Sequence, residues 1–152
     1  MKPIIRQAIA LVAFTRMITA ADLTSSGDWV ESLNTSSLVS GAGSDLPSNL
    51  ESISGITVLS VSNITGSWRI TARRSASTWD SHVALYVRRT SGGIGSGTIT
   101  GGDSYVELTG GDSEIFTGSN ARGSISVQYK LTGLAHNLPP ATYLSSLTFT
   151  VQ

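Results

Sequence analysis

Cysteine is absent from this chain of 152 residues, and charged residues make up only 13% of it. Without cysteine there are no disulfides, no thiolate chemistry, no cysteine-based metal site and no lipid-modified N-terminal cysteine. Charged side chains are about half as frequent as the roughly 25% typical of soluble domains. The chain is long enough for one buried core, so we expect one domain that depends on apolar packing alone.

The N-terminal stretch MKPIIRQAIALVAFTRMITAADL has the order of a secretory signal. Basic residues come first, a short apolar run follows over 8–14, and small residues end the stretch at Ala21. The run is too short to span a membrane as a helix, which needs about 20 apolar residues. We therefore predict a signal peptide at 1–21, secretion or a periplasmic or cell-surface location, and one domain at 22–152. The alternative is an amphipathic N-terminal helix that stays attached.

Cleavage would leave seven basic against ten acidic residues, a net charge of −3. A mildly acidic chain is a poor general binder of nucleic acid. The chain has two histidines, no G-x-S-x-G motif and no pair of histidines spaced to hold a metal on one element. We therefore expect no enzyme activity, no cofactor and no catalytic residues.

Alternation of apolar and polar residues with a period of two predicts several β-strands. The segment at 22–51 is rich in Ser and Thr and predicts little regular structure. Short strands with one apolar face and no helical period favour an all-β fold, an antiparallel immunoglobulin-like β-sandwich, with a barrel as the alternative. The residues predicted to face the core are Leu59, Val61, Trp68, Ile70, Ala72, Val83, Leu85, Val87, Ile125, Val127, Tyr129, Leu131, Tyr143, Leu147, Phe149 and Val151.

The last segment, LPPATYLSSLTFTVQ, places Tyr143 after two prolines and before a strand, which indicates a tyrosine corner. These residues resemble the closing segment of secreted bacterial β-sandwich families, namely spore coat protein U-like and fimbrial-subunit-like domains. The resemblance covers about fifteen residues. It implies a structural subunit, although fimbrial subunits of the chaperone-usher kind usually carry a disulfide that this chain lacks.

A Gly-Gly pair recurs every nine residues, at positions 92, 101 and 110. Calcium-binding nonapeptide repeats would need an Asp at the sixth place of each unit, but Gly97, Val106 and Ile115 stand there. We therefore interpret the stretch as turns joined by short strands of a hairpin, SYVELT and SEIFT. The remaining weak calcium candidates are Asp103, Glu107, Asp112 and Glu114.

Two groups of side chains are candidates for a ligand or partner surface. If the strand at 83–88 folds back on the strand at 67–73, one exposed side carries Arg69, Arg73, Tyr86 and Arg88. Such a face could hold an acidic glycan or carboxylates of a partner, or it could simply be solvated. Trp79, in a polar loop, could stack on a sugar ring or cap the core.

The function that these features favour is structural. We expect a subunit of a filament, coat or matrix, or a fimbria-like adhesion protein, that self-associates or binds other subunits through sheet edges. The segment Asp22 to Leu38 is the hypothetical donor strand. The competing hypothesis is a carbohydrate-binding or adhesion module that uses the tryptophan, tyrosine and arginines named above.

Overall fold

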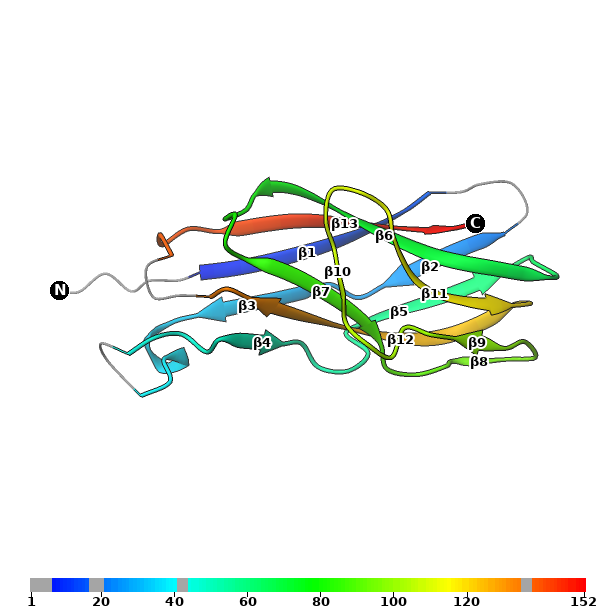
Figure 1. Ribbon diagram of the computed structural model, residues 1–152, viewed down its shortest axis with the longest axis horizontal. Helices are drawn as coiled ribbons and strands as arrows, with labels where there is room; N and C mark the ends of the chain where they lie inside the picture. Colours follow the sequence, from blue (N-terminus) through cyan, green and yellow to red (C-terminus); the bar gives the residue numbers. More distant parts are fainter. Residues whose placement is uncertain (1–6, 17–20, 41–43, 135–137) are drawn as a thin grey trace.

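The structure is a computed structural model that describes residues 7–16, 21–40, 44–134 and 138–152. Within these residues the chain forms two β-sheets and one short 3-10 helix, η1 (Thr35–Ser37). Figure 1 shows an elongated molecule whose strands run along its length. The all-β prediction is confirmed, and the sheets are antiparallel apart from one pair of strands.

The first sheet has six strands in the order β3-β1-β13-β6-β11-β9. Its one parallel pair is β1 with β13; the other neighbours are antiparallel. The strands are β1 (Gln7–Arg16), β3 (Trp29–Leu33), β6 (Ser67–Thr78), β9 (Ile99–Thr100), β11 (Ser113–Ser119) and β13 (Tyr143–Val151).

The second sheet has seven strands, with β10-β7-β12-β5-β2 as its main order. Strand β12 is long enough to pair with β4 near its end and with β8 near its start. The strands are β2 (Asp22–Ser26), β4 (Asn49–Glu51), β5 (Thr57–Ser62), β7 (Ala84–Arg89), β8 (Ile94–Gly95), β10 (Val106–Glu107) and β12 (Arg122–Thr132).

One apolar core lies between the sheets. The alternation read from the sequence is confirmed, since every predicted inward residue is buried except Tyr143, which is half-buried and packs against the core. Period two places side chains i and i+2 on one face, so each apolar set turns inward together. The rings of Trp29 and Tyr129 stack at 6.2 Å, and Trp68 meets Phe116 edge-on.

The expectation of little regular structure at 22–51 is wrong for its first half, and also for its last three residues, which form β4. Strand β2 pairs with β5 at the edge of the second sheet, and β3 pairs with β1 at the edge of the first. Trp29 and Leu33 are buried, and the Thr57 hydroxyl donates to the Gly27 carbonyl at 2.8 Å. Sequence reasoning missed β2 and β3 because polar Ser25 and Glu31 stand at positions of inward parity and the apolar Val30 faces outward, which breaks the apolar period.

The predicted tyrosine corner is present. The Tyr143 hydroxyl donates to the carbonyl of Pro139 at 2.7 Å. Burial raises the pKa of this hydroxyl, which stays protonated as the hydrogen bond requires. The corner fixes the chain as it enters β13, the strand that both β1 and β6 flank.

The Gly-rich segment contains turns and short strands as predicted, but SYVELT and SEIFT do not form a hairpin with each other. Strand β10 pairs with β7 in the second sheet, whereas β11 pairs with β6 in the first. Between β10 and β11 the chain crosses from the second sheet to the first. At this crossing Leu108 is buried, and the Arg74 amide donates to the Thr109 carbonyl. Gly101 and Gly102, both at positive φ, form the turn before β10.

The predicted signal peptide falls partly outside the described residues, since positions 1–6 and 17–20 are not described. The part that is described, β1, lies as a strand inside the first sheet. Among the described residues, no helix has the length and apolar character needed to cross a membrane.

Candidate binding surfaces

The four residues expected on one exposed face lie on two different faces. Arg69 and Arg73 belong to β6 and point outward from the first sheet, each about half exposed. Tyr86 and Arg88 belong to β7, in the second sheet. The prediction that these four residues share one exposed side is therefore wrong, because the chain between β6 and β7 crosses from one sheet to the other and does not turn back within one sheet.

Trp79 is not an exposed platform. Its indole Nε1 donates to the carbonyl of Val83 at 2.7 Å, and its ring packs against the core. The guanidinium of Arg74 lies 4.8 Å from the ring centroid. Burial lowers the pKa of Arg74, and the nearby carboxylate of Glu107 partly opposes that shift. Of the two roles expected for Trp79, capping one end of the core fits its contacts.

A cluster of tyrosines and cations on the second sheet was not predicted in full. The Lys130 ammonium lies 5.1 Å from the ring of Tyr86 and 4.2 Å from that of Tyr105. Arg88 lies 4.6 Å from the same Tyr105 ring and donates twice to Gln128, at 3.0 and 2.8 Å. These cation–π contacts hold the loop that carries Tyr105 against the sheet.

Burial raises the pKa of Tyr105 to about 12, and the carboxylate of Glu51 contributes to the shift. The phenol is therefore neutral at physiological pH, as its place between two cations and a carboxylate allows. Cross-strand register could have indicated part of this cluster, because Lys130 lies opposite Tyr86. Tyr105 belongs to the predicted short strand SYVELT, but no sequence signal placed that strand beside β7 and β12.

The weak calcium candidates do not form a metal site. Asp103 pairs with Arg89 at 2.8 Å, while Asp112 and Glu114 each lie 4.0 Å from an arginine of β6. Glu107 lies near Arg74 instead. Within the described part of the chain, no three ligating side chains come together to hold a metal ion. Each carboxylate therefore faces a different arginine, three of them on β6 and one, Arg89, on β7.

The half-buried Asp80 and the exposed His82 form a pair. One carboxylate oxygen of Asp80 accepts from the backbone amide of His82 at 2.8 Å and lies 2.8 Å from its Nδ1. These contacts, the backbone hydrogen bond first, lower the pKa of Asp80. The motif is a turn in which an Asp side chain bonds the backbone two residues on. The other histidine, His136, lies outside the described residues.

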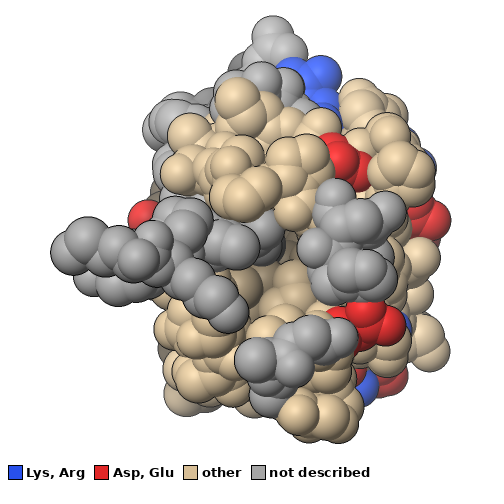
Figure 2. Space-filling model, turned by 90° about the vertical axis from the view of Figure 1, so that its left-hand side faces the viewer, with Lys and Arg blue, Asp and Glu red and all other residues tan. Residues whose placement is uncertain are grey.

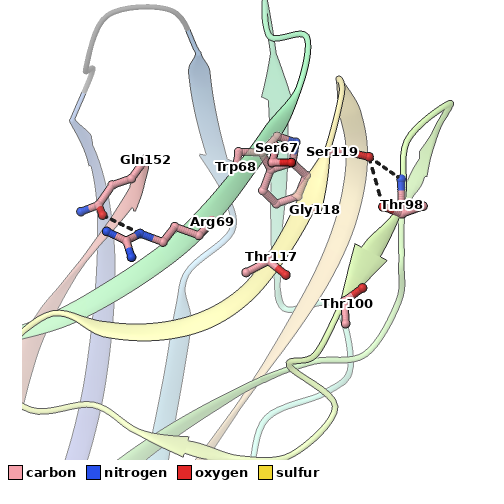
Figure 3. Close-up of a pocket in the computed structure, with 9 residues that line it drawn as sticks. All are labelled: Ser67, Trp68, Arg69, Thr98, Thr100, Thr117, Gly118, Ser119 and Gln152. Atoms are coloured by element: carbon pink, nitrogen blue, oxygen red, sulfur yellow. Dashed lines mark hydrogen bonds between the residues drawn. The ribbon is translucent and has the colours of Figure 1, made fainter.

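A shallow groove of about 560 Å³ opens on the outer face of the first sheet, over β6, β11 and β9. Figure 3 shows the hydroxyl groups and Arg69 that line it, with the ring of Trp68 beside Gly118. Trp68 is almost fully buried, and its Nε1 donates to the Asn120 carbonyl at 2.8 Å. The full lining is Ser67, Trp68, Arg69, Thr98, Thr100, Thr117, Gly118, Ser119 and Gln152.

The last candidate is the place of β1 in the first sheet. Eight residues of β1, from Ile9 to Arg16, pair in parallel with β13, and five, from Gln7 to Leu11, pair antiparallel with β3. In Figure 1 the blue β1 ribbon lies beside the red β13, although the two strands come from opposite ends of the chain. The segment with the pattern of a removable leader therefore fills an interior position of a sheet.

Charged side chains are sparse at one end of the molecule. Figure 2, which views the molecule from the end where β1 begins, shows mostly uncharged residues with isolated acidic and basic groups among them. A surface of this kind offers hydroxyls and backbone groups for recognition more than a broad electrostatic field.

Comparison with known proteins adds no family or relative. No protein-family model matches the chain, and no curated protein matches it. The likeness of the C-terminal segment to fimbrial-subunit-like and coat-protein domains therefore rests on those residues alone.

Proposed function

We propose that this protein is a secreted or cell-surface structural subunit, of a filament, coat or matrix, that associates with partner proteins by strand addition to its first sheet. Its role is interaction rather than catalysis, and it uses no cofactor. The observation that carries the proposal is the position of β1, between β3 and β13.

Removal of residues 1–21 by a signal peptidase would open this sheet in its interior. The backbone groups of β3 and β13 that pair with β1 would lose their partners along five and eight register positions. Unpaired strand edges of this kind template the binding of another extended chain, which restores the hydrogen bonds. The incoming strand would run parallel to β13 and antiparallel to β3.

The donor strand in this proposal differs from the one expected from the sequence. The segment Asp22 to Leu38 is held in its own chain after cleavage, since β2 pairs with β5 and the side chains of Trp29 and Leu33 are buried in the core, although β3 itself would lose β1. Strand β3 of this segment lies beside the opening that β1 would leave, and the segment does not insert into the sheet of a neighbouring molecule. The donor is therefore a strand of a partner protein, and the mature chain supplies the acceptor.

The test compares the full chain with the chain beginning at Asp22. The sequence of the exported protein's N-terminus establishes whether 1–21 is removed. We expect the shorter chain to melt at a lower temperature and to self-associate, measured by circular dichroism and light scattering. A synthetic peptide of residues 7–16 should restore a monomer with a higher melting temperature, whereas a scrambled peptide should not.

A second variant covers the case in which the shorter chain does not fold. In the full chain, Ala13→Pro removes a backbone donor from the middle of β1, opposite Leu147. It should loosen β1 without shortening the chain and make it bind the added peptide. A shorter chain that is monomeric, equally stable and indifferent to the peptide would contradict the proposal.

A further inference from the structure

The groove on the first sheet has a regular arrangement of polar groups. Three strands and the residue that follows β13 place one residue each in a row across the sheet. Gln152 and Arg69 exchange backbone hydrogen bonds at 2.9 and 3.0 Å, and Thr117 lies opposite both Arg69 and Thr100 in register. Neighbouring strands are about 4.8 Å apart, so the row presents a polar group at each such step over three steps.

A second row runs parallel to the first, two residues further along the strands. It consists of Ser67, Ser119 and Thr98, which are joined by register and by a bond from the Ser119 amide to the Thr98 carbonyl at 2.9 Å. The Thr98 and Ser119 hydroxyls lie 3.1 Å apart. The two rows are separated by roughly 6.6 Å, the rise of two strand residues. The groove is therefore a grid of hydroxyls with one cation in it (Figure 3).

Several of these groups have hydrogen-bonding capacity to spare. Arg69 uses its Nε to donate to Gln152 at 2.8 Å, which fixes the guanidinium plane. Its only ion pair among the described residues is with Glu114, at 4.0 Å, and both side chains are more than half exposed. Among the residues that the structure describes, the side-chain hydroxyls of Thr100 and Thr117 take part in no hydrogen bond.

We propose that this groove binds an extended, carboxylate-bearing polysaccharide. Arg69 presents the free edge of a fixed guanidinium, which suits a carboxylate bound through two parallel hydrogen bonds. The hydroxyls both donate and accept, as sugar hydroxyls do. The distance between neighbouring polar groups in a row equals the spacing between strands, and one sugar unit of a polysaccharide has a similar length. A chain of sugar units lying across the strands would therefore meet one polar group for each unit.

The form of the groove favours a polysaccharide over other occupants of similar charge. An acidic peptide would need pockets for its side chains or an unpaired strand edge for its backbone. The groove lies on the face of the sheet and reaches the edge strand β9 at Thr100 and, just before it, Thr98, while most of its lining comes from strands that are paired on both sides. A volume of about 560 Å³ falls in the range of ligand sites, about 300 to 1,000 Å³, yet its open form suits a segment of a polymer. The site lies on the far side of β13 from β1, so it is independent of the proposed strand addition.

The decisive experiment compares two arginines of the same strand. Arg69 and Arg73 both point outward from β6, are similarly exposed, and each has a carboxylate at 4.0 Å, but only Arg69 lines the groove. The full chain is titrated with hexagalacturonate, an oligomer of uronic acid, and with neutral maltohexaose, by isothermal titration calorimetry. We expect binding of hexagalacturonate, and a loss of affinity of about tenfold in Arg69→Gln against less than twofold in Arg73→Gln.

Further variants test the contribution of the groove hydroxyls and of the carboxylate that competes for Arg69. Thr117→Val keeps a β-branched side chain but removes the hydroxyl, and should weaken binding by about threefold to tenfold. Glu114→Gln removes the carboxylate that competes for Arg69 and should tighten binding, whereas Asp112→Asn, beside Arg73, should leave it unchanged. A thermal melt confirms that each variant is folded.

Three results would overturn the inference. The first is no measurable binding of hexagalacturonate at low salt, where electrostatic contacts are strongest. The second is an equal effect of the two arginine substitutions, which would indicate general charge attraction. The third is equal affinity for maltohexaose, which would remove the role of the carboxylate. None of these results depends on β1, so the strand-addition proposal stands or falls separately.

Discussion

Replacing Trp29 with alanine tests most directly whether the N-terminal segment belongs to the chain's own core. Trp29 is 3% exposed and stacks on the ring of Tyr129 with an interplanar angle of 9°. Truncating a buried Trp to Ala in a packed core costs about 3 to 5 kcal/mol. For a domain of this size each kcal/mol corresponds to about 2 to 4 °C, so the melting temperature should fall by about 6 to 20 °C.

The neighbouring residue supplies the control. Val30 lies on the same strand but is 61% exposed, so Val30→Ala should change the free energy of unfolding by less than about 0.5 kcal/mol. Urea denaturation followed by circular dichroism measures both. If Trp29→Ala fails to fold, Trp29→Phe should give an intermediate loss. Equal and small effects of Trp29→Ala and Val30→Ala would refute the placement of β3 in the core and return Asp22 to Leu38 to the role of a free donor strand.

Two other predictions concern packing and pH. A Cβ at Gly118 would lie 2.4 Å from the ring of Trp68, whereas a Cβ at Gly110 would meet nothing within 4 Å. Gly118→Ala should therefore lower the free energy of unfolding by about 1 to 3 kcal/mol, and Gly110→Ala by less than about 0.5 kcal/mol. Urea denaturation measures both. Burial raises the pKa of Tyr105 to about 12 and that of Tyr129 further, so the folded state holds more protons than the unfolded state above pH 10. The contribution of these two tyrosines to the free energy of unfolding should therefore be constant below pH 10 and fall as the pH rises toward 12. Tyr105→Phe should make the fall of the free energy of unfolding with pH less steep. An equally steep fall in this variant would contradict the raised pKa of Tyr105.

The alternation of apolar and polar residues was enough to predict the principal strands and their inward faces. It works for β5, β6, β7, β12 and β13 because a side chain on a strand has only two sides to choose from, and burial selects one. The tyrosine corner was also readable from sequence, because its prolines and Tyr143 are adjacent in the chain and its hydrogen bond is local. The same reasoning failed for β2 and β3, where polar Ser25 and Glu31 stand between the buried residues and apolar Val30 faces outward.

Which strands become neighbours was a matter for the tertiary structure. Period two does not say which sheet a strand joins, so the sequence could not separate Arg69 on β6 from Arg88 on β7. The groove likewise combines residues of β6, β9 and β11 with Gln152, which follows β13, and these polar residues align only through long-range register. Most plainly, the apolar run near the N-terminus predicts a leader by local composition, while its pairing with β13 depends on residues more than 130 positions away. Local chemistry fixes what each segment can form, and backbone pairing between distant segments decides where it lies.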